Sequence, residues 1–203
     1  MSRASSAAIL VLLAALGAGL TYLAQHGSAP RIAAEQRLID SRYLLDLLPP
    51  GSYDNQPLDQ PLTLENTALG NSTLLAGYRA TKAGRACAVL LRSQALGYAG
   101  TIDLLIAIDL DGRLLGVKTL KQTETPGLGA RIADWPNAWL DAFSGKSRTD
   151  PGDNGWALKK DQGHFDQIAG ATITSRAVIN ATHDALRYFD EHRHSLLGSP
   201  SDE

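Results

Sequence analysis

Cysteine is almost absent from the sequence: Cys87 is the only one among 203 residues. A single thiol cannot form a disulfide within the chain. Cysteine and histidine also never cluster at the spacing of metal ligands. We therefore expect neither a disulfide framework nor a zinc or iron–sulfur site in this chain.

Basic runs and nucleotide-binding glycine motifs are missing as well. The formal net charge is −2 and no stretch is dense in Lys and Arg, whereas nucleic-acid-binding proteins usually carry a basic stripe. Neither G-x-G-x-x-G nor G-x-x-x-x-G-K occurs. The composition, 44% apolar and 20% charged, is otherwise that of an ordinary globular protein. We therefore expect no binding of nucleic acid and no independent oxidation of NADH.

One long apolar run is present near the N-terminus. Residues 7–24 (AAILVLLAALGAGLTYLA) carry no charge and follow Arg3. This run reaches the length of about 17–25 residues that a membrane-spanning helix needs, whereas the apolar part of a cleaved signal peptide has about 7–15 residues. The GSA at positions 27–29 is a poor cleavage site, and no cysteine follows for lipid attachment. We therefore favour an uncleaved anchor in the lipid bilayer over residues 1–25, rather than a signal peptide.

Charges that flank the apolar run, and proline and glycine residues that end helices, predict the membrane orientation and the domain boundaries. Arg3 precedes the anchor and Arg31 follows it, and the positive-inside rule then favours a cytoplasmic N-terminus and a body on the other side of the membrane. Residues 26–50 are expected to form a linker helix that stops at a Pro-Pro-Gly sequence. Residues 51–195 are expected to form one domain, and residues 196–203 a flexible tail.

The middle of the chain has the pattern and turn signals of antiparallel strands. Residues 74–80 and 86–92 flank a Lys-Ala-Gly-Arg tip and are predicted to form a hairpin. Residues 101–109 and 114–120 flank an Asp-Gly turn and are predicted to pair in the same way. The preceding loop, residues 51–73, is expected to contain only a short extended piece.

Helical patterns dominate the C-terminal half. Residues 130–143 are predicted to be helical, with Trp135 and Trp139 on one side as core residues. Residues 156–160 are predicted to form a short strand. An apolar stripe at helical spacing predicts a long helix over residues 175–192. The fold class is therefore α+β, with an N-terminal transmembrane helix followed by one antiparallel-sheet domain that has flanking helices.

A small, hydroxyl-bearing turn, G-A-T-I-T-S, precedes the long helix. Thr174 or Ser175 is expected to cap the helix N-terminus. Thr172 lies two or three residues earlier, beside Gly170 and Ala171, whose small size lets a large group approach the backbone. A helix N-terminus also suits a phosphate, because it presents free N–H groups. From the residues alone, the Thr172 hydroxyl is either a second cap or the acceptor of a phosphodiester.

Residues 166–172 (D-Q-I-A-G-A-T) resemble the flavinylation motif of the FMN-binding domain family, in which an acidic residue, two variable residues, Ser or Thr, Gly, Ala and Thr follow one another. Further segments are similar to one branch of this family, the RnfG/RsxG proteins of Rnf/Rsx electron-transport complexes. These segments are GYAG (97–100), ETPGLG (124–129), WALKK (156–160) and FDQ (165–167). The apolar N-terminus, LLP (47–49) and YDN (53–55) agree with the same branch, so the resemblance extends over nearly the whole chain.

The resemblance implies a covalently bound FMN. In the family, a flavin transferase moves FMN from FAD onto the last Thr of the motif, which is Thr172, and Asp166 matches the acidic position that the transferase recognises. The other residues implied around the cofactor are Gly170, Ala171, Thr174, Ser175, Glu124, Thr125, Gly127 and Leu128. Lys159 or Lys160 is expected to offset the phosphate charge, unless both only end a solvated strand. The resemblance implies no catalytic residue and no metal ligand.

Two positions depart from the family pattern. Ala169 stands where the motif usually has Ser or Thr, so flavin attachment is expected to be slower if that hydroxyl assists the transferase. Gln122 and Thr123 stand where the branch often carries His, which leaves one titratable group fewer near the flavin.

The implied function is that of a membrane-anchored electron relay. Such a flavoprotein accepts and passes electrons between other membrane subunits of an Rnf/Rsx complex, and the cofactor supplies the redox chemistry. It is expected in the bacterial inner membrane as a single-pass protein, with its domain in the periplasm, where a covalent bond prevents loss of the cofactor. Two alternatives stay open: the flavin subunit of a sodium-translocating NADH:quinone oxidoreductase, and an anchored assembly protein without redox function.

Overall fold

The computed structural model describes residues 45–64 and 67–198. The predicted anchor, its orientation in the membrane, most of the linker helix and the end of the tail lie outside these ranges. Within the two ranges, no helix is long and apolar enough to span a bilayer.

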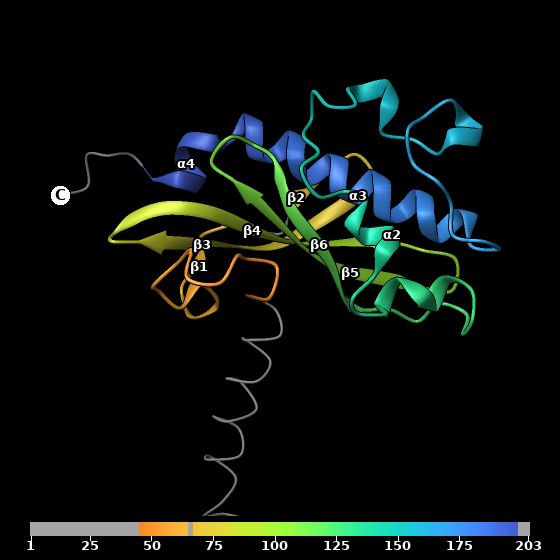
Figure 1. The fold of residues 1–203 in the computed structure, drawn as a ribbon, viewed down its shortest axis with the longest axis horizontal. Coiled ribbons are helices and arrows are strands. Elements are labelled where there is room, and N and C mark those ends of the chain that lie inside the picture. Colours follow the sequence, from red (N-terminus) through yellow and green to blue (C-terminus); the bar gives the residue numbers. More distant parts are fainter. Residues whose placement is uncertain (1–44, 65–66, 199–203) are drawn as a thin grey trace, which may run out of the picture. The chain divides into compact units, whose positions relative to one another are not determined.

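An antiparallel sheet forms the centre of the domain (Figure 1). Its strand order is β1-β3-β4-β5-β6, and β2 also pairs with β3. The strands are β1 (Pro61–Leu62), β2 (Thr67–Ala68), β3 (Ser72–Lys82), β4 (Arg85–Leu96), β5 (Thr101–Asp109) and β6 (Leu114–Lys121). Both predicted strand pairs, β3 with β4 and β5 with β6, are confirmed. The preceding loop contains two short strands where one extended piece was expected.

Local chemistry explains the two tight turns of the sheet. Between β3 and β4 the chain reverses at Ala83 and Gly84, whose φ angles are +50° and +75°, as a two-residue turn of the I′ type requires. Between β5 and β6, the Asp109 Oδ1 atom accepts hydrogen bonds from the backbone N–H groups of Asp111 (2.9 Å) and Arg113 (2.8 Å). These turns set the register in which neighbouring strands pair.

One face of the sheet is covered by the long helix α3 (Thr172–Glu191) (Figure 1). Its predicted apolar stripe is buried in the main core of the domain. The buried members of the stripe are Val178, Ile179, Ala185, Leu186 and Phe189. A polar contact adds to this packing, because the buried Asp184 Oδ2 atom accepts from the Asn71 N–H (2.7 Å) and the Ser72 hydroxyl (3.1 Å) at the start of β3.

The opposite face of the sheet packs against the C-terminal end of the predicted linker and the loop that follows it. Successive residues of β4 point to opposite faces, so Val89 contributes to the α3 side and Leu90 to the other side. There, Leu45 and Leu47 are buried in a second, smaller apolar cluster. The helical conformation ends before Pro49, as the Pro-Pro-Gly sequence predicted.

The prediction of one helix over residues 130–143 is wrong. The chain instead forms a short 3-10 helix, η2 (Gly129–Ala133), an irregular link and then the single turn α2 (Ala138–Asp141). Pro136 lies in the link, where its missing N–H and its restriction of the preceding residue stop a continuous helix. Asn137 then caps α2, because its Oδ1 atom accepts from the N–H groups two and three residues later (3.0 and 3.2 Å).

The prediction of a short strand over residues 156–160 is also wrong. This part of the chain is a loop with short 3-10 helices, and only one bridge, between Leu158 and Phe165, resembles strand pairing. The remaining short helices are η1 (Pro57–Asp59), η3 (Asp153–Gly155), η4 (Lys159–Asp161) and α4 (Arg193–Leu197). Leu196 of α4 is buried, so ordered structure continues into the region predicted to be a flexible tail.

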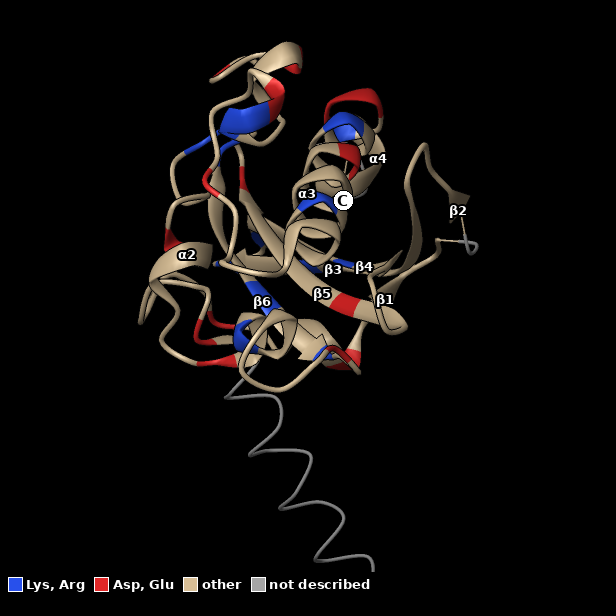
Figure 2. Ribbon diagram, turned by 90° about the vertical axis from the view of Figure 1, so that its right-hand side faces the viewer, with Lys and Arg blue, Asp and Glu red and all other residues tan. Residues whose placement is uncertain are grey.

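Charged residues of both signs are distributed over the loops, the helices and the strand ends (Figure 2), but one lysine is buried within the sheet. The side chain of Lys118 on β6 is 1% exposed, with its Nζ atom 4.1 Å from the centre of the Trp135 ring and 3.7 Å from Asp46 Oδ2. Burial lowers the pKa of Lys118, and the nearby Asp46 carboxylate partly opposes this. Trp135, at 37% exposure, therefore lies at the surface and covers the buried Lys118 ammonium group, rather than filling the core as predicted.

Candidate functional site

The long helix α3 begins earlier than predicted. Ala171 is its N-cap and Thr172 its first residue. The prediction that Thr174 or Ser175 caps the helix is therefore wrong, because both lie inside the first turn and are buried. Gly170, with φ of +74°, turns the chain directly into the helix, so Thr172 stands at the helix entrance and not in the loop before it.

Buried hydrogen bonds of Ser175 hold the N-terminal end of α3 in place. Its hydroxyl donates to the Ala171 carbonyl (2.8 Å) and accepts from the Ile168 N–H (3.0 Å). Ser175 has no exposed surface, so both bonds form away from water, where they hold the backbone firmly. The 166–172 motif is thus anchored to the first turn of α3.

Glu124 joins three segments at the same place. This residue is 4% exposed. One carboxylate oxygen, Oε1, accepts from the Ala99 N–H (3.0 Å) in the turn between β4 and β5. The other, Oε2, accepts a short hydrogen bond from the Thr174 hydroxyl in the first turn of α3. A buried carboxylate is stabilised by such bonds, and here they tie the loop after β6 to both neighbouring segments.

Two glycines make this close approach possible. A Cβ atom at Gly129 would lie 2.7 Å from the Thr174 hydroxyl and 2.8 Å from Glu124 Oε2. At Gly170, a side chain would meet the Leu128 Cδ2 atom at 2.8 Å, in addition to the unfavourable positive φ. Gly129 of the ETPGLG segment and Gly170 of the GAT segment therefore have a packing reason, which is close contact of the loop with the helix entrance.

The Thr172 hydroxyl lies between an amide and an ammonium group. It donates to Gln167 Oε1 (2.9 Å) and accepts from Lys160 Nζ (3.0 Å). Lys159 points elsewhere and forms an ion pair with Asp166 Oδ2 (2.6 Å). Of the two lysines considered from the sequence, the structure therefore brings Lys160 to the Thr172 hydroxyl, while Lys159 neutralises the acidic residue of the motif.

An open pocket of about 540 Å³ extends from this hydroxyl. Its volume lies within the range of about 300–1,000 Å³ that is usual for small-molecule sites. The lining residues are Tyr98, Glu124, Thr125, Leu128, Gly129, Gln167, Gly170, Ala171, Thr172, Ile173 and Thr174. Three large apolar side chains of this lining are exposed: Tyr98 at 70%, Ile173 at 50% and Leu128 at 43%. We call this cavity the Thr172 pocket; it has a polar base at the helix entrance and an apolar rim.

Most of the predicted cofactor residues meet in the Thr172 pocket. Five of the residues considered do not line it, namely Gly127, Lys159, Lys160, Asp166 and Ser175, although Lys160 contacts the lining residue Thr172. Sequence reasoning missed Tyr98, Gly129, Gln167 and Ile173 as lining residues. Tyr98, Gly129 and Gln167 lie in the GYAG, ETPGLG and FDQ segments, so the signal was present in the sequence without a role attached to each residue. Among the described residues, no group of His, Cys, Asp or Glu side chains could hold a metal ion.

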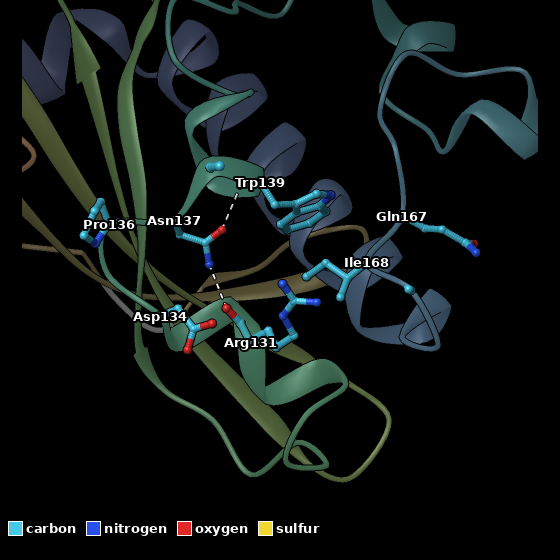
Figure 3. Close-up of a pocket in the computed structure, with 9 residues that line it drawn as sticks. Arg131, Asp134, Pro136, Asn137, Trp139, Gln167 and Ile168 are labelled. Carbon is cyan, nitrogen blue, oxygen red and sulfur yellow. Dashed lines mark hydrogen bonds between the residues drawn. The ribbon is translucent and has the colours of Figure 1, made fainter.

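A second cavity of about 400 Å³ lies on the other side of Gln167 (Figure 3). It is lined by Arg131, Asp134, Pro136, Asn137, Ala138, Trp139, Gln167, Ile168 and Ala169. The Trp139 indole N–H donates to the Asp166 carbonyl (2.7 Å), and Asn137 Nδ2 donates to the Arg131 carbonyl (2.8 Å). Trp139 thus packs at the edge of the core, as predicted, and its indole holds the start of the 166–172 motif.

Comparisons with known proteins agree with this geometry. The model of the family described as FMN-binding domain matches residues 97–187, which contain both the loop after β6 and the first turn of α3. A solved structure, NqrC of Shewanella oneidensis, superposes with a TM-score of 0.51 over 74% of this chain and 91% of that chain. The two sequences are 21% identical, so this likeness concerns the fold alone.

Curated relatives are much more similar in sequence. A Pseudomonas aeruginosa protein, named as the G subunit of an ion-translocating oxidoreductase complex, is 50% identical over 198 residues, which are 97% of this chain and 92% of the relative. A protein of the same name from Cereibacter sphaeroides is 40% identical over 186 residues, 92% of this chain and 82% of the relative. Identity at this level over nearly the whole length shows that the chain belongs to the family of G subunits of ion-translocating oxidoreductase complexes.

Proposed function

We propose that this chain relays electrons within an ion-translocating oxidoreductase complex through an FMN whose phosphate is bonded to Thr172 Oγ1. The observation that carries the proposal is the position of that hydroxyl. It lies at the first residue of α3, at the base of the Thr172 pocket and 3.0 Å from the Lys160 ammonium group. Family membership and the match to the FMN-binding domain support the cofactor's identity.

The pocket fits both ends of FMN. At the phosphate end, the first N–H groups of a helix have no partner within the helix, and they favour an anion. Lys160 adds a positive charge at the same point. At the ring end, Tyr98, Leu128 and Ile173 offer apolar surface beside polar backbone groups. When bound there, FMN supplies one- and two-electron redox chemistry.

The residues of the chain position the cofactor and leave it accessible. Glu124 and Thr174 hold the pocket base together, so the attachment point does not move relative to the sheet. The apolar rim stays exposed, which leaves room for a partner protein at the pocket mouth. Because the sequence contains no dinucleotide-binding glycine motif, we infer that electrons arrive from and leave to other subunits and not from NADH directly.

The proposal includes the membrane and the maturation enzyme. Residues 1–25 would anchor the chain in the bacterial inner membrane, residues 26–50 would form the linker, and residues 51–195 would form the periplasmic flavin domain before a short tail at 196–203. The apolar run of residues 7–24 supports this layout. A flavin transferase that reads Asp166 would attach the cofactor, and the covalent bond would keep it from diffusing away outside the cytoplasm.

The alternatives have less support. Likeness to the NqrC structure at 21% identity concerns the fold, whereas 50% identity links this chain to a G subunit of the ion-translocating complexes. A non-redox assembly role leaves the close packing of Gly129 and Gly170 around the pocket without a purpose. We therefore retain the electron relay as the function that the site supports best.

Intact-mass analysis after co-expression with a flavin transferase tests the proposal. We expect the wild type to gain the mass of one FMN less water and to fluoresce in a denaturing gel, and Thr172→Ala to do neither. Thr174→Val serves as the control, since it removes a second hydroxyl of the first turn and should still be modified. Unmodified wild type, or loss of the modification in Thr174→Val alone, would sink the assignment.

A further inference from the structure

We propose that Lys160 is a catalytic residue of flavin attachment, supplied by this chain to its own modification. Its ammonium group activates the Thr172 hydroxyl as a nucleophile and afterwards holds the phosphodiester that forms. This inference rests on the proposed function, in which Thr172 accepts FMN. It assigns to Lys160 a chemical task that goes beyond carrying the motif to the transferase.

The hydrogen bonds of Thr172 orient its oxygen for attack. The hydroxyl proton points to Gln167 Oε1 (2.9 Å), so the oxygen lone pairs are directed elsewhere, and one of them faces Lys160 Nζ (3.0 Å). A positive charge at hydrogen-bond distance favours the anionic form of an oxygen. Thr172 is half-buried and Lys160 is exposed, so water screens this charge in part and the direct hydrogen bond carries the effect.

Lys160 and its neighbour Lys159 have different partners. Lys159 Nζ lies 2.6 Å from Asp166 Oδ2, so an adjacent carboxylate already neutralises it. Among the described residues, Lys160 contacts the Thr172 oxygen and no carboxylate. Two successive lysines of the same short helix therefore have different surroundings, and only one of them faces the acceptor oxygen.

A bidentate ion pair holds the lysine in place. Arg176, one turn after Thr172 on α3, donates through Nε and Nη2 to the two carboxylate oxygens of Asp161, at 2.9 Å each. Asp161 directly follows Lys160 in η4. Because a bidentate arginine–carboxylate pair fixes orientation as well as distance, it keeps η4 beside the helix entrance. Arg176 and Asp161 are thus positioning residues for Lys160.

The reaction balances without oxidation or reduction. The Thr172 oxygen attacks the phosphorus on the FMN side of a flavin adenine dinucleotide, and a bond between phosphorus and Oγ1 forms. The phosphoanhydride bond breaks, and AMP leaves with the electron pair. The hydroxyl proton passes to solvent or to a base of the transferase. Lys160 favours loss of the Thr172 hydroxyl proton as the attack begins. It then stabilises the negative charge on the non-bridging phosphoryl oxygens during transfer and in the phosphodiester that results.

The test is a time course of flavin attachment, followed by intact mass, with purified apo-protein, flavin transferase and FAD. We expect Lys160→Gln to be modified about tenfold more slowly, because a hydrogen bond to a charged group is worth about that factor or more. Lys160→Arg should restore most of the rate, since the charge returns. Lys82→Gln, the control at the tip of the β3–β4 hairpin, removes one exposed lysine charge at the end of β4 remote from Tyr98 and should stay within about twofold of the wild type.

A second comparison separates catalysis from general structure. Arg176→Gln should slow attachment less than Lys160→Gln does. The double variant Lys160→Gln/Arg176→Gln should be no slower than Lys160→Gln alone, because Arg176 acts through Lys160. Attachment to Lys160→Gln at the wild-type rate, or a double variant with fully additive effects, would overturn the inference. Wild type that accepts no FMN at all would instead contradict the proposed function.

Discussion

The first turn of α3 and the body of the same helix are held by different forces. In the first turn, the buried groups are hydroxyls: Thr174 bonds to Glu124, and Ser175 bonds to the backbone of the motif before the helix. In the body, Val178 and Phe189 have no exposed surface and pack into the main apolar core. One continuous helix thus has an entrance held by polar contacts and a body held by apolar burial.

This difference separates the site from the scaffold. Apolar burial is roughly proportional to area and has no direction, so it secures the helix on the sheet without orienting any single atom. Hydrogen bonds are directional, so the polar contacts of the entrance orient Thr172 and the Thr172 pocket. Variants of the body should therefore act on stability, and variants of the entrance on the flavin.

The largest expected effect is a loss of stability on substitution in the body of α3. Phe189→Ala removes a fully buried ring and should lower the free energy of unfolding by about 3–5 kcal/mol. Ile173→Ala changes an exposed side chain in the first turn of the same helix and should alter this free energy by no more than about 0.5 kcal/mol. Equilibrium urea unfolding measures both. Similar costs for the two variants would remove the distinction between entrance and body.

Glu124→Ala tests the polar entrance. The Ala99 N–H and the Thr174 hydroxyl would lose their acceptor, so we expect unfolding to become easier by about 1–3 kcal/mol. The covalent flavin should remain on Thr172 but move more freely, which lowers its fluorescence anisotropy. Lys121→Ala, an exposed change at the end of β6 that does not line the pocket, should leave both quantities near their wild-type values. Unchanged anisotropy in Glu124→Ala would show that this carboxylate does not shape the pocket.

The pH dependence of stability tests a half-buried histidine, His183, in the body of α3. Burial lowers the pKa of His183, and its bond to Asp153 (3.0 Å) partly opposes this shift. Below a pH of about 6.5 the unfolded chain therefore binds a proton that the folded chain resists. Stability should fall as the pH drops from about 6.5 toward the lower folded-state pKa. In His183→Gln, thermal unfolding followed across this range should show a shallower decline; an equal decline would assign it to other groups.

Ala169→Ser should have the smallest effect. The side chain at position 169 is exposed and lines the second cavity rather than the Thr172 pocket. An added hydroxyl there replaces no buried contact and lies outside the bonds that orient Thr172. We expect the rate of flavin attachment to change by less than about twofold, within the range of a surface substitution. An increase of tenfold or more would mean that the transferase reads this hydroxyl directly.

Much of the domain could be predicted from local patterns. The strand pairs β3-β4 and β5-β6 and the long helix follow from alternation, turn residues and helical periodicity. Predictions failed where local signals competed. Pro136 interrupted the helix expected over residues 130–143, and the segment 156–160 became a loop because only one bridge pairs it with the chain that follows. Short segments without a repeating pattern take their conformation from their neighbours.

By itself, the sequence determined the family, the sheet and the identity of Thr172 as the candidate acceptor, because motif, turn and periodicity are local properties. Only the tertiary structure decided which groups surround that hydroxyl. It placed Glu124 against Thr174 and chose Lys160 over Lys159 as the cation beside Thr172. Adjacent lysines are alike in sequence, and the direction in which each side chain points depends on how η4 packs against α3. The physical reason is that hydrogen bonds and ion pairs act over a few ångströms, between residues that lie far apart along the chain.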